Sequence, residues 1–244
     1  MGRLDGKVVI ITGGSRGQGE AEVRLFAAEG AKVVAADVRV DAGQALADEL
    51  GPNVMFTRLD VSSEEEWASA IAATVEQFGG LNVVVNNAGI GHFAPLAEHT
   101  LADYQRVIAV NQIGVFLGMR AAIAPMSAAG GGSIVNISSG AGLRGIKNMI
   151  AYSASKYAVT GMTASAALEL ARYNIRVNSI HPGVIDTPML GVTSTAANAK
   201  MIKATPLRRL GLPSEIANVA LFLASDESSF MTGSHVVADG GVIT

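Results

Sequence analysis

A tyrosine and a lysine stand four residues apart in "NMIAYSASKYAVTG", residues 148–161, within a run of small residues. Tyrosine normally keeps its proton until about pH 10, and lysine is normally a charged surface residue. On a helix, Tyr152 and Lys156 would share one face, with Cβ atoms about 5–6 Å apart. A fixed cation near a phenol favours the ionised phenol and lowers its pKa toward working pH, which suits general acid–base catalysis. The alternative is an ordinary helix in which the two residues form an incidental i,i+4 pair. Other motifs in the chain are needed to choose between these two interpretations.

A glycine-rich turn lies near the start of the chain, in "VVIITGGSRGQGEAEV". Gly13, Gly17 and Gly19 separate a predicted first strand from a predicted first helix. Such glycines allow a tight turn and close backbone approach, and a helix N-terminus offers free N–H groups and a positive dipole to a pyrophosphate. A strand–helix junction can use glycines for the turn alone. The position directly after the first strand favours dinucleotide binding.

Asp37 ends the predicted second strand, eighteen residues after Gly19. A carboxylate at this place can accept hydrogen bonds from both ribose hydroxyls of a dinucleotide and repels a 2′-phosphate. Arg16 and Arg39 stand nearby and could meet a 2′-phosphate, but they leave the charge of Asp37 in place. The sequence therefore favours NAD(H) over NADP(H).

The elements that would position these residues alternate along the chain. Apolar, β-branched runs predict seven strands, at 7–12, 31–37, 54–60, 81–87, 132–138, 175–181 and 235–239. Helical patterns fall at 18–29, 41–50, 63–78, 101–127, 152–173 and 214–224. Near-continuous apolar strands that alternate with helices are typical of a seven-stranded parallel, doubly wound (Rossmann-type) α/β sheet with helices on both faces.

No linker or repeat divides the chain, so we expect residues 1–244 to form a single dinucleotide-binding and catalytic domain. The segment 184–212 is long and fits neither a strand nor a crossover helix. Long irregular segments in compact domains are commonly functional, and we expect a substrate lid there.

Composition excludes several other classes of protein. The chain has 244 residues, 49% hydrophobic and 16% charged, with a net charge of −3 and no basic run, which argues against a nucleic-acid partner. It has no cysteine, which fits a reducing compartment. The four histidines show no metal-ligand spacing, so we expect no metal site. Neither a signal peptide nor a run of about 18 apolar residues is evident, so we expect a cytoplasmic protein without a membrane partner.

Five motifs occur in order: "TGGSRGQG", "NNAG" (86–89), "NISS" (136–139), "YSASK" (152–156) and "HPG" (181–183). With them the chain, from about residue 5 to residue 241, resembles the short-chain dehydrogenase/reductase family. Within that family, "GSIVNISS", "ALELARYNIRVNSIHPG" and "LASDESSFMTG" look most like NAD-dependent 3α,20β-hydroxysteroid dehydrogenases and related secondary-alcohol dehydrogenases.

The resemblance implies a catalytic tetrad. Ser139 would bind the substrate oxygen, and Tyr152 would exchange the proton as general acid or base. Lys156 would lower the pKa of Tyr152 and hydrogen-bond the nicotinamide ribose, and Asn111 would hold a water that links Lys156 to solvent. The resemblance also implies cofactor contacts, which are Gly13, Arg16, Gly17, Gln18, Gly19, Asp37, Asp60, Val61, Asn87, Ala88, Gly89, Tyr152, Lys156, Pro182, Gly183, Ile185 and Thr187.

The predicted function is therefore NAD(H)-dependent interconversion of a secondary alcohol and a ketone, with an apolar substrate such as a hydroxysteroid. Candidate substrate contacts are mostly apolar: Phe93, Leu143, Met149, Ile150, Met189, Leu190, Val192, Met201 and Ile202. An NADPH-dependent 3-oxoacyl-thioester reductase shares these motifs and is the alternative. A catalytically inactive nucleotide-binding sensor or scaffold is a more remote one, because no member of the tetrad is missing.

The helical stretches 101–127 and 152–173 carry small and apolar residues around much of their circumference, which predicts a second covering surface. On the first stretch these are Val107, Val110, Gly114 and Met119; on the second they are Ala158, Gly161, Met162, Ser165, Leu168 and Glu169. In the family such helices, and the last strand, meet their counterparts across two-fold axes. We therefore expect a homotetramer with closed D₂ symmetry.

Overall fold

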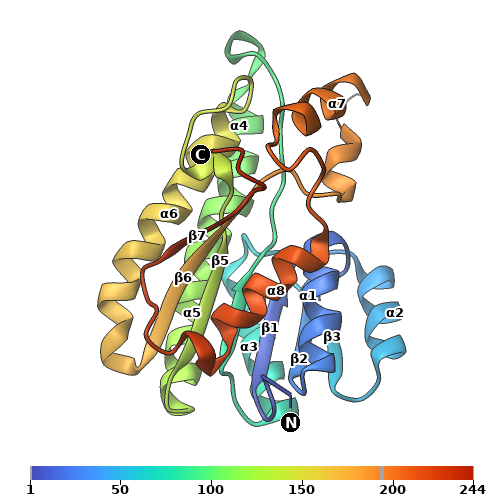
Figure 1. Cartoon of the computed structure of the whole chain (residues 1–244). Coiled ribbons are helices and arrows are strands. Elements are labelled where there is room, and N and C mark those ends of the chain that lie inside the picture. Colours follow the sequence, from blue (N-terminus) through green and yellow to red (C-terminus); the bar gives the residue numbers. More distant parts are fainter. Residues whose placement is uncertain (1, 193–194, 244) are drawn as a thin grey trace.

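The computed structural model describes residues 2–192 and 195–243, without the side chains of residues 191, 192 and 195–198. One parallel sheet of seven strands forms its centre, in the order β3-β2-β1-β4-β5-β6-β7 (Figure 1). The strands are β1 (Val8–Thr12), β2 (Lys32–Asp37), β3 (Val54–Arg58), β4 (Val83–Asn86), β5 (Gly132–Ile137), β6 (Ile175–Pro182) and β7 (His235–Ala238). This confirms the predicted doubly wound fold.

Helices cover both faces of the sheet, as Figure 1 shows. They are α1 (Gly17–Ala28), α2 (Val40–Leu50), α3 (Glu64–Phe78), α4 (Leu101–Ile108), α5 (Gly114–Ala128), α6 (Ile150–Leu170), α7 (Thr195–Ala204) and α8 (Pro213–Ala224). Local signals set several boundaries. At the start of α3 the Ser63 side chain accepts a hydrogen bond from the Glu66 N–H, and at its end Gly79 adopts a left-handed conformation with φ 86°.

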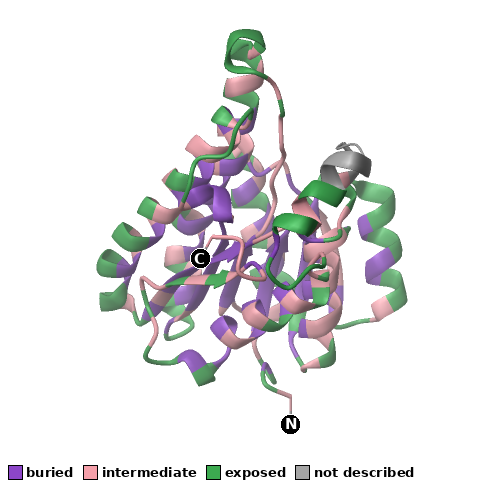
Figure 2. Ribbon diagram, turned by 45° about the horizontal axis from the view of Figure 1, so that its top comes forward, coloured by how far each residue is buried: buried purple, intermediate pink, exposed green. Residues whose placement is uncertain are grey.

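The core has two halves because successive residues of a strand face opposite sides of the sheet. On β1, Val9 and Ile11 pack on the side of α1 and α8, while Ile10 packs on the side of α3, α5 and α6. In Figure 2 the central strands are coloured mostly as buried and the outward faces of the helices as exposed, while the edge strands β3 and β7 are only partly buried. Burial on both faces explains the near-continuous apolar strand sequences.

The helix expected at 101–127 is interrupted. A π-helical segment, Ala109–Ile113, joins α4 to α5. Val107, Gly114 and Met119, which the sequence suggested as part of an outer face, are buried within the chain, and the exposed face carries Ile113 and Phe116 instead. The run Leu101–Ala128 is long and apolar enough to cross a membrane. It packs against α3, α6 and the sheet, so we interpret it as a core helix.

The segment 184–212 contains a helix, α7, that the sequence pattern did not predict. Within α7, Met201 and Ile202 are half-buried while Lys203 and Ala204 are exposed. Because only about one turn of the helix packs against the rest of the protein, its sequence shows little of the apolar periodicity that would predict a helix. The two ends of the segment are joined. Asp186 donates its N–H to the Gly211 carbonyl at 2.8 Å, and Gly211 donates its own to the Val184 carbonyl at 2.9 Å. The segment is thus an excursion from the sheet with its ends fixed together.

Candidate active site

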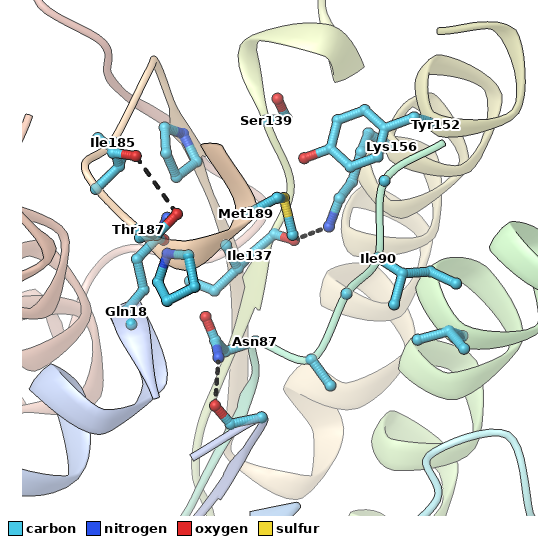
Figure 3. Close-up of a pocket in the computed structure, with 18 of the residues that line it drawn as sticks. Gln18, Asn87, Ile90, Ile137, Ser139, Tyr152, Lys156, Ile185, Thr187 and Met189 are labelled. Atoms are coloured by element: carbon cyan, nitrogen blue, oxygen red, sulfur yellow. Dashed lines mark hydrogen bonds between the residues drawn. The ribbon is translucent and has the colours of Figure 1, made fainter. Parts of the chain in front are cut away.

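A cleft of about 540 Å³ opens at the carboxyl ends of the strands. It lies where the strand order reverses, between β1 and β4, which is the usual ligand site of an open α/β sheet. Sixteen of the seventeen residues predicted to contact the cofactor line it; the exception is Gly19. Of the predicted tetrad, Ser139, Tyr152 and Lys156 line it and Asn111 does not. Figure 3 shows Ser139, Tyr152 and Lys156 on one side and Gln18 and Thr187 opposite them.

The glycine turn is as tight as a dinucleotide site requires. A Cβ on Gly19 would lie 2.2 Å from the Gly13 carbonyl oxygen, so Gly19 serves the turn rather than the cleft wall. Gly13 and Gly17 have φ of 65° and 60°, a region that other residues rarely adopt. Gln18 has a side-chain oxygen that is buried without a hydrogen-bond partner in the described part of the chain. Close-approach glycines and an unsatisfied polar atom fit a dinucleotide cofactor.

Asp37 ends β2 in the cleft wall and is almost fully buried. Its carboxylate accepts four hydrogen bonds, from the backbone N–H and hydroxyl of Ser15 and from the backbone N–H and guanidinium of Arg39. The guanidinium contact is the longest, at 3.3 Å. Since a carboxylate has about four acceptor positions, a ribose hydroxyl must replace one of these partners. The Arg39 guanidinium, which is partly exposed, is the easiest to displace.

The remaining cofactor candidates hold positions around the same cleft. Asp60 accepts hydrogen bonds from the Ser62 N–H and hydroxyl, which lower the pKa of its carboxyl. The Asn87 amide donates to the Thr12 carbonyl at 2.9 Å and so ties the end of β4 to the end of β1. Thr187 donates to the Ile185 carbonyl at 3.4 Å beside the glycine turn (Figure 3).

Tyr152 and Lys156 share one face of α6, and the lysine ammonium lies 5.7 Å from the centre of the tyrosine ring. The Lys156 ammonium is buried and donates to the Ile137 carbonyl at 2.7 Å (Figure 3). Ser139 follows β5, and its hydroxyl faces the Tyr152 hydroxyl across the cleft (Figure 3). The hydroxyls of Ser139 and Tyr152 therefore converge on one point of the cleft.

The lowered pKa that is expected of Tyr152 depends on the charge of Lys156 together with that of the oxidised nicotinamide, and it stays a prediction. Burial raises the pKa of Tyr152, and the nearby Ser139 hydroxyl offsets this only in part. Burial also lowers the pKa of Lys156 to about 8. The ammonium donates to the Ile137 carbonyl rather than to the phenol oxygen. With a pKa of about 8 the ammonium is still mostly protonated at pH 7, so Lys156 keeps a positive charge near the Tyr152 ring.

Asn111 lies in the π-helical segment and is fully buried. Its side-chain oxygen accepts from the Ile90 N–H at 2.8 Å, and its amide donates to the Ile90 carbonyl at 2.9 Å and to the Ser155 hydroxyl at 3.2 Å. A π-helical turn often marks a functional position because it inserts one residue into a helix. Here Asn111 fixes the backbone at Ile90, one residue past "NNAG", beside the turn of α6 that carries Lys156.

The far part of the cleft is apolar. Five of the predicted substrate contacts line it: Phe93, Met149, Met189, Leu190 and Met201. Leu143, Ile150 and Ile202 do not line it, and the side chain of Val192 lies outside the described residues. The sequence did not suggest Ile90, Ile146 and Val184, which also contribute. Ile90 and Val184 each stand directly after a motif and Ile146 lies between two, and only the folded chain shows that they line the cleft.

Comparisons with known proteins agree with this geometry. A family model described as enoyl-(acyl carrier protein) reductase matches residues 13–243. A 3-alpha-(or 20-beta)-hydroxysteroid dehydrogenase of Mycobacterium tuberculosis is 47% identical over 99% of this chain and 91% of its own. A trans-4-hydroxycyclohexanecarboxylate dehydrogenase of Sinomonas cyclohexanicum is 45% identical, over 98% and 93%. A cyclohexanol dehydrogenase of an Acinetobacter strain is 41% identical, over 98% and 95%. The chain belongs to the short-chain dehydrogenase/reductase family.

Proposed function

We propose that this protein is a NAD(H)-dependent oxidoreductase that interconverts a secondary alcohol and a ketone on an apolar, cyclic substrate. The observation that carries the proposal is the convergence of the Ser139 and Tyr152 hydroxyls beside an apolar wall. The names of the relatives, which include hydroxysteroid and cyclohexanol dehydrogenases, support a ring-bearing substrate. A hydroxysteroid or a substituted cyclohexanol fits the apolar side chains of Phe93, Met149 and Met189.

In this proposal the nicotinamide supplies or accepts the hydride. Ser139 donates its hydroxyl hydrogen to the substrate oxygen and fixes that oxygen beside Tyr152. Tyr152 then gives its phenolic proton to the oxygen in ketone reduction and removes it in alcohol oxidation. Lys156 holds positive charge beneath the phenol and would contact the nicotinamide ribose, and the oxidised nicotinamide adds positive charge when bound. Both charges favour the tyrosinate and oppose the effect of burial.

The preference for NAD(H) is supported by Asp37, whose buried carboxylate would repel a 2′-phosphate. Arg16 and Arg39 line the same end of the cleft and favour the alternative, an NADPH-dependent 3-oxoacyl-thioester reductase. Their charges act on each other, since Arg39 and burial both lower the pKa of Arg16. We give more weight to Asp37 because its charge is fixed at the end of a strand, whereas the arginine side chains can turn toward solvent.

We further propose that residues 1–244 form one domain, and that 184–212 acts as a lid hinged at the paired residues Val184, Asp186 and Gly211.

A D₂ homotetramer is supported by large apolar side chains that stay exposed. Leu168 on α6 is 85% exposed, and Phe230, before the edge strand β7, is fully exposed. Since no cysteine requires an oxidising compartment, we propose a cytoplasmic location.

The test is a set of initial rates for the purified protein with NAD⁺ and NADP⁺, using cyclohexanol, a 3α-hydroxysteroid and a 20β-hydroxysteroid. In the direction of reduction, initial rates are measured for a 3-oxoacyl thioester with NADH and with NADPH. We expect oxidation of at least one cyclic alcohol with NAD⁺. Activity confined to the thioester with NADPH would replace the proposal by its alternative.

The matched control for this test is Tyr152→Phe, which removes the transferable proton and keeps the ring. Turnover should fall by about 10²–10⁴-fold, the usual contribution of general acid–base catalysis. Binding of NADH, followed by its fluorescence, should persist. A variant that keeps more than about a tenth of wild-type turnover would show that Tyr152 is not the acid–base group.

A further inference from the structure

His181 is a fully buried histidine whose two ring nitrogens both have partners. It belongs to β6 and immediately precedes Pro182 and Gly183 in the cleft wall. Its Nδ1 lies 3.0 Å from the carbonyl oxygen of Ser139, and its Nε2 lies 2.9 Å from the hydroxyl oxygen of Ser179. The ring therefore bridges β6 to the residue that is proposed to bind the substrate oxygen.

The partners of the ring fix its tautomer. A backbone carbonyl oxygen can only accept a hydrogen bond, so Nδ1 must carry the hydrogen that it donates to Ser139. In a neutral imidazole Nε2 is then an acceptor, and the Ser179 hydroxyl donates to it. Burial lowers the pKa of His181 and outweighs the hydrogen bond to the Ser139 carbonyl, which raises it; the nearby charges of His235 and Lys156 lower it further, and the ring stays neutral. The neutral ring acts as a fixed donor toward Ser139.

The last ladder bond from this end of β5 to β6 is made by the Ser138 N–H, which donates to the Ile180 carbonyl at 2.8 Å, and after Ser139 the chain turns into a short 3₁₀ helix, Gly140–Gly142. Ser139 has extended dihedral angles, and its hydroxyl accepts from the Ala141 N–H. Its carbonyl accepts from the Gly142 N–H at 2.9 Å, a contact within the same turn. The bond from His181 is the one that ties this carbonyl to another strand.

We propose that His181 is a positioning residue, which holds the Ser139 carbonyl through its Nδ1–H and so sets where the Ser139 hydroxyl meets the substrate oxygen. This inference rests on the proposed function of Ser139. It adds to the site a hydrogen-bonded chain that runs from Ser179 through His181 to Ser139, from strand β6 to the cleft. The substrate does not have to touch His181 for the ring to affect turnover.

Two substitutions by amide residues distinguish the role of Nδ1 of His181 from that of Nε2. Asparagine carries its nitrogen on Cγ, where histidine carries Nδ1, so His181→Asn keeps a donor toward the Ser139 carbonyl. Glutamine carries its nitrogen one atom further out, near the place of Nε2, so His181→Gln loses that donor. A misplacement of about 1 Å can cost about 10²-fold in rate. We expect His181→Gln to lower kcat by about 10- to 100-fold, and His181→Asn to restore it to within about threefold.

Folding and cofactor binding are measured on the same variants, by thermal unfolding and by NADH fluorescence. The proposal expects the loss in His181→Gln to fall on kcat with the NADH dissociation constant unchanged. The control is His235→Gln, because the His235 ring lies 5.5 Å from that of His181 without bonding Ser139. Equal losses in the Asn and Gln variants, or the same loss in His235→Gln, would overturn the proposal.

A double variant distinguishes a failure of the role proposed for His181 from a failure of the proposed function of Ser139. If His181 acts through the Ser139 hydroxyl, adding His181→Gln to Ser139→Ala should cost no further turnover, since no hydroxyl remains to be placed. Losses that multiply would show that His181 acts elsewhere. Ser139→Ala with nearly full turnover would instead refute the role of Ser139 in the proposed function.

Discussion

Glu22 gives a prediction whose size follows from the structure. It lies on the inner face of α1, is fully buried, and neither carboxyl oxygen has a hydrogen-bond partner in the described part of the chain. Burial of the charged form raises the pKa of Glu22 to about 8. The side chain is therefore a neutral acid at pH 7, and a buried charge appears only in more alkaline solution.

The sign of the pH dependence follows from proton counting. Between a pKa of 4.5 in the unfolded chain and about 8 in the folded one, the folded protein keeps a proton that the unfolded chain releases. Stability therefore falls as pH rises through this window and levels off above it. A shift of about 3.5 units at about 1.36 kcal/mol per unit gives a loss of about 5 kcal/mol, most of it between pH 5 and pH 8.

The perturbation is Glu22→Gln, which keeps the shape of the side chain and removes the ionisation. We expect wild type and variant to have similar unfolding free energies at pH 5, with the variant more stable by several kcal/mol at pH 8. The assay is urea unfolding followed by circular dichroism from pH 5 to pH 8, at one fixed protein concentration because oligomerisation would shift the midpoint. The control is Glu76→Gln on the exposed face of α3, for which we expect no comparable gain. Parallel pH curves for wild type and Glu22→Gln would refute the reasoning.

Two further predictions concern the cofactor and the assembly. Asp37→Ser should weaken NADH use and improve NADPH use, because it removes the carboxylate and frees Arg39 to meet a 2′-phosphate; the ratio of kcat/KM values for the two cofactors measures this. Wild type that already prefers NADPH would contradict it. Light scattering should give a mass about four times the 25.0 kDa chain, and Phe230→Asp should lower it, because D₂ closure must bury the exposed apolar side chains. A monodisperse wild-type monomer at micromolar concentration would refute the tetramer.

Much of this protein is determined by local sequence. The apolar strand runs, the glycines of the first turn and the four-residue spacing of Tyr152 and Lys156 act through backbone conformation and helical periodicity. Such signals depend on near neighbours, which is why the sheet and most helices could be predicted. The same holds for Asp37, since a residue that ends the second strand of this fold must reach the cleft.

Tertiary structure decided the features that join distant parts of the chain. The π-helical turn aims Asn111 at Ile90 and Ser155, and periodicity over 101–127 could not reveal an inserted residue. Nothing local in the sequence indicates that His181 reaches Ser139 or that Glu22 has no hydrogen-bond partner among the residues that the structure describes. Hydrogen bonding, burial and the resulting pKa depend on residues that folding brings together, often more than forty positions apart, so only the folded chain could fix them.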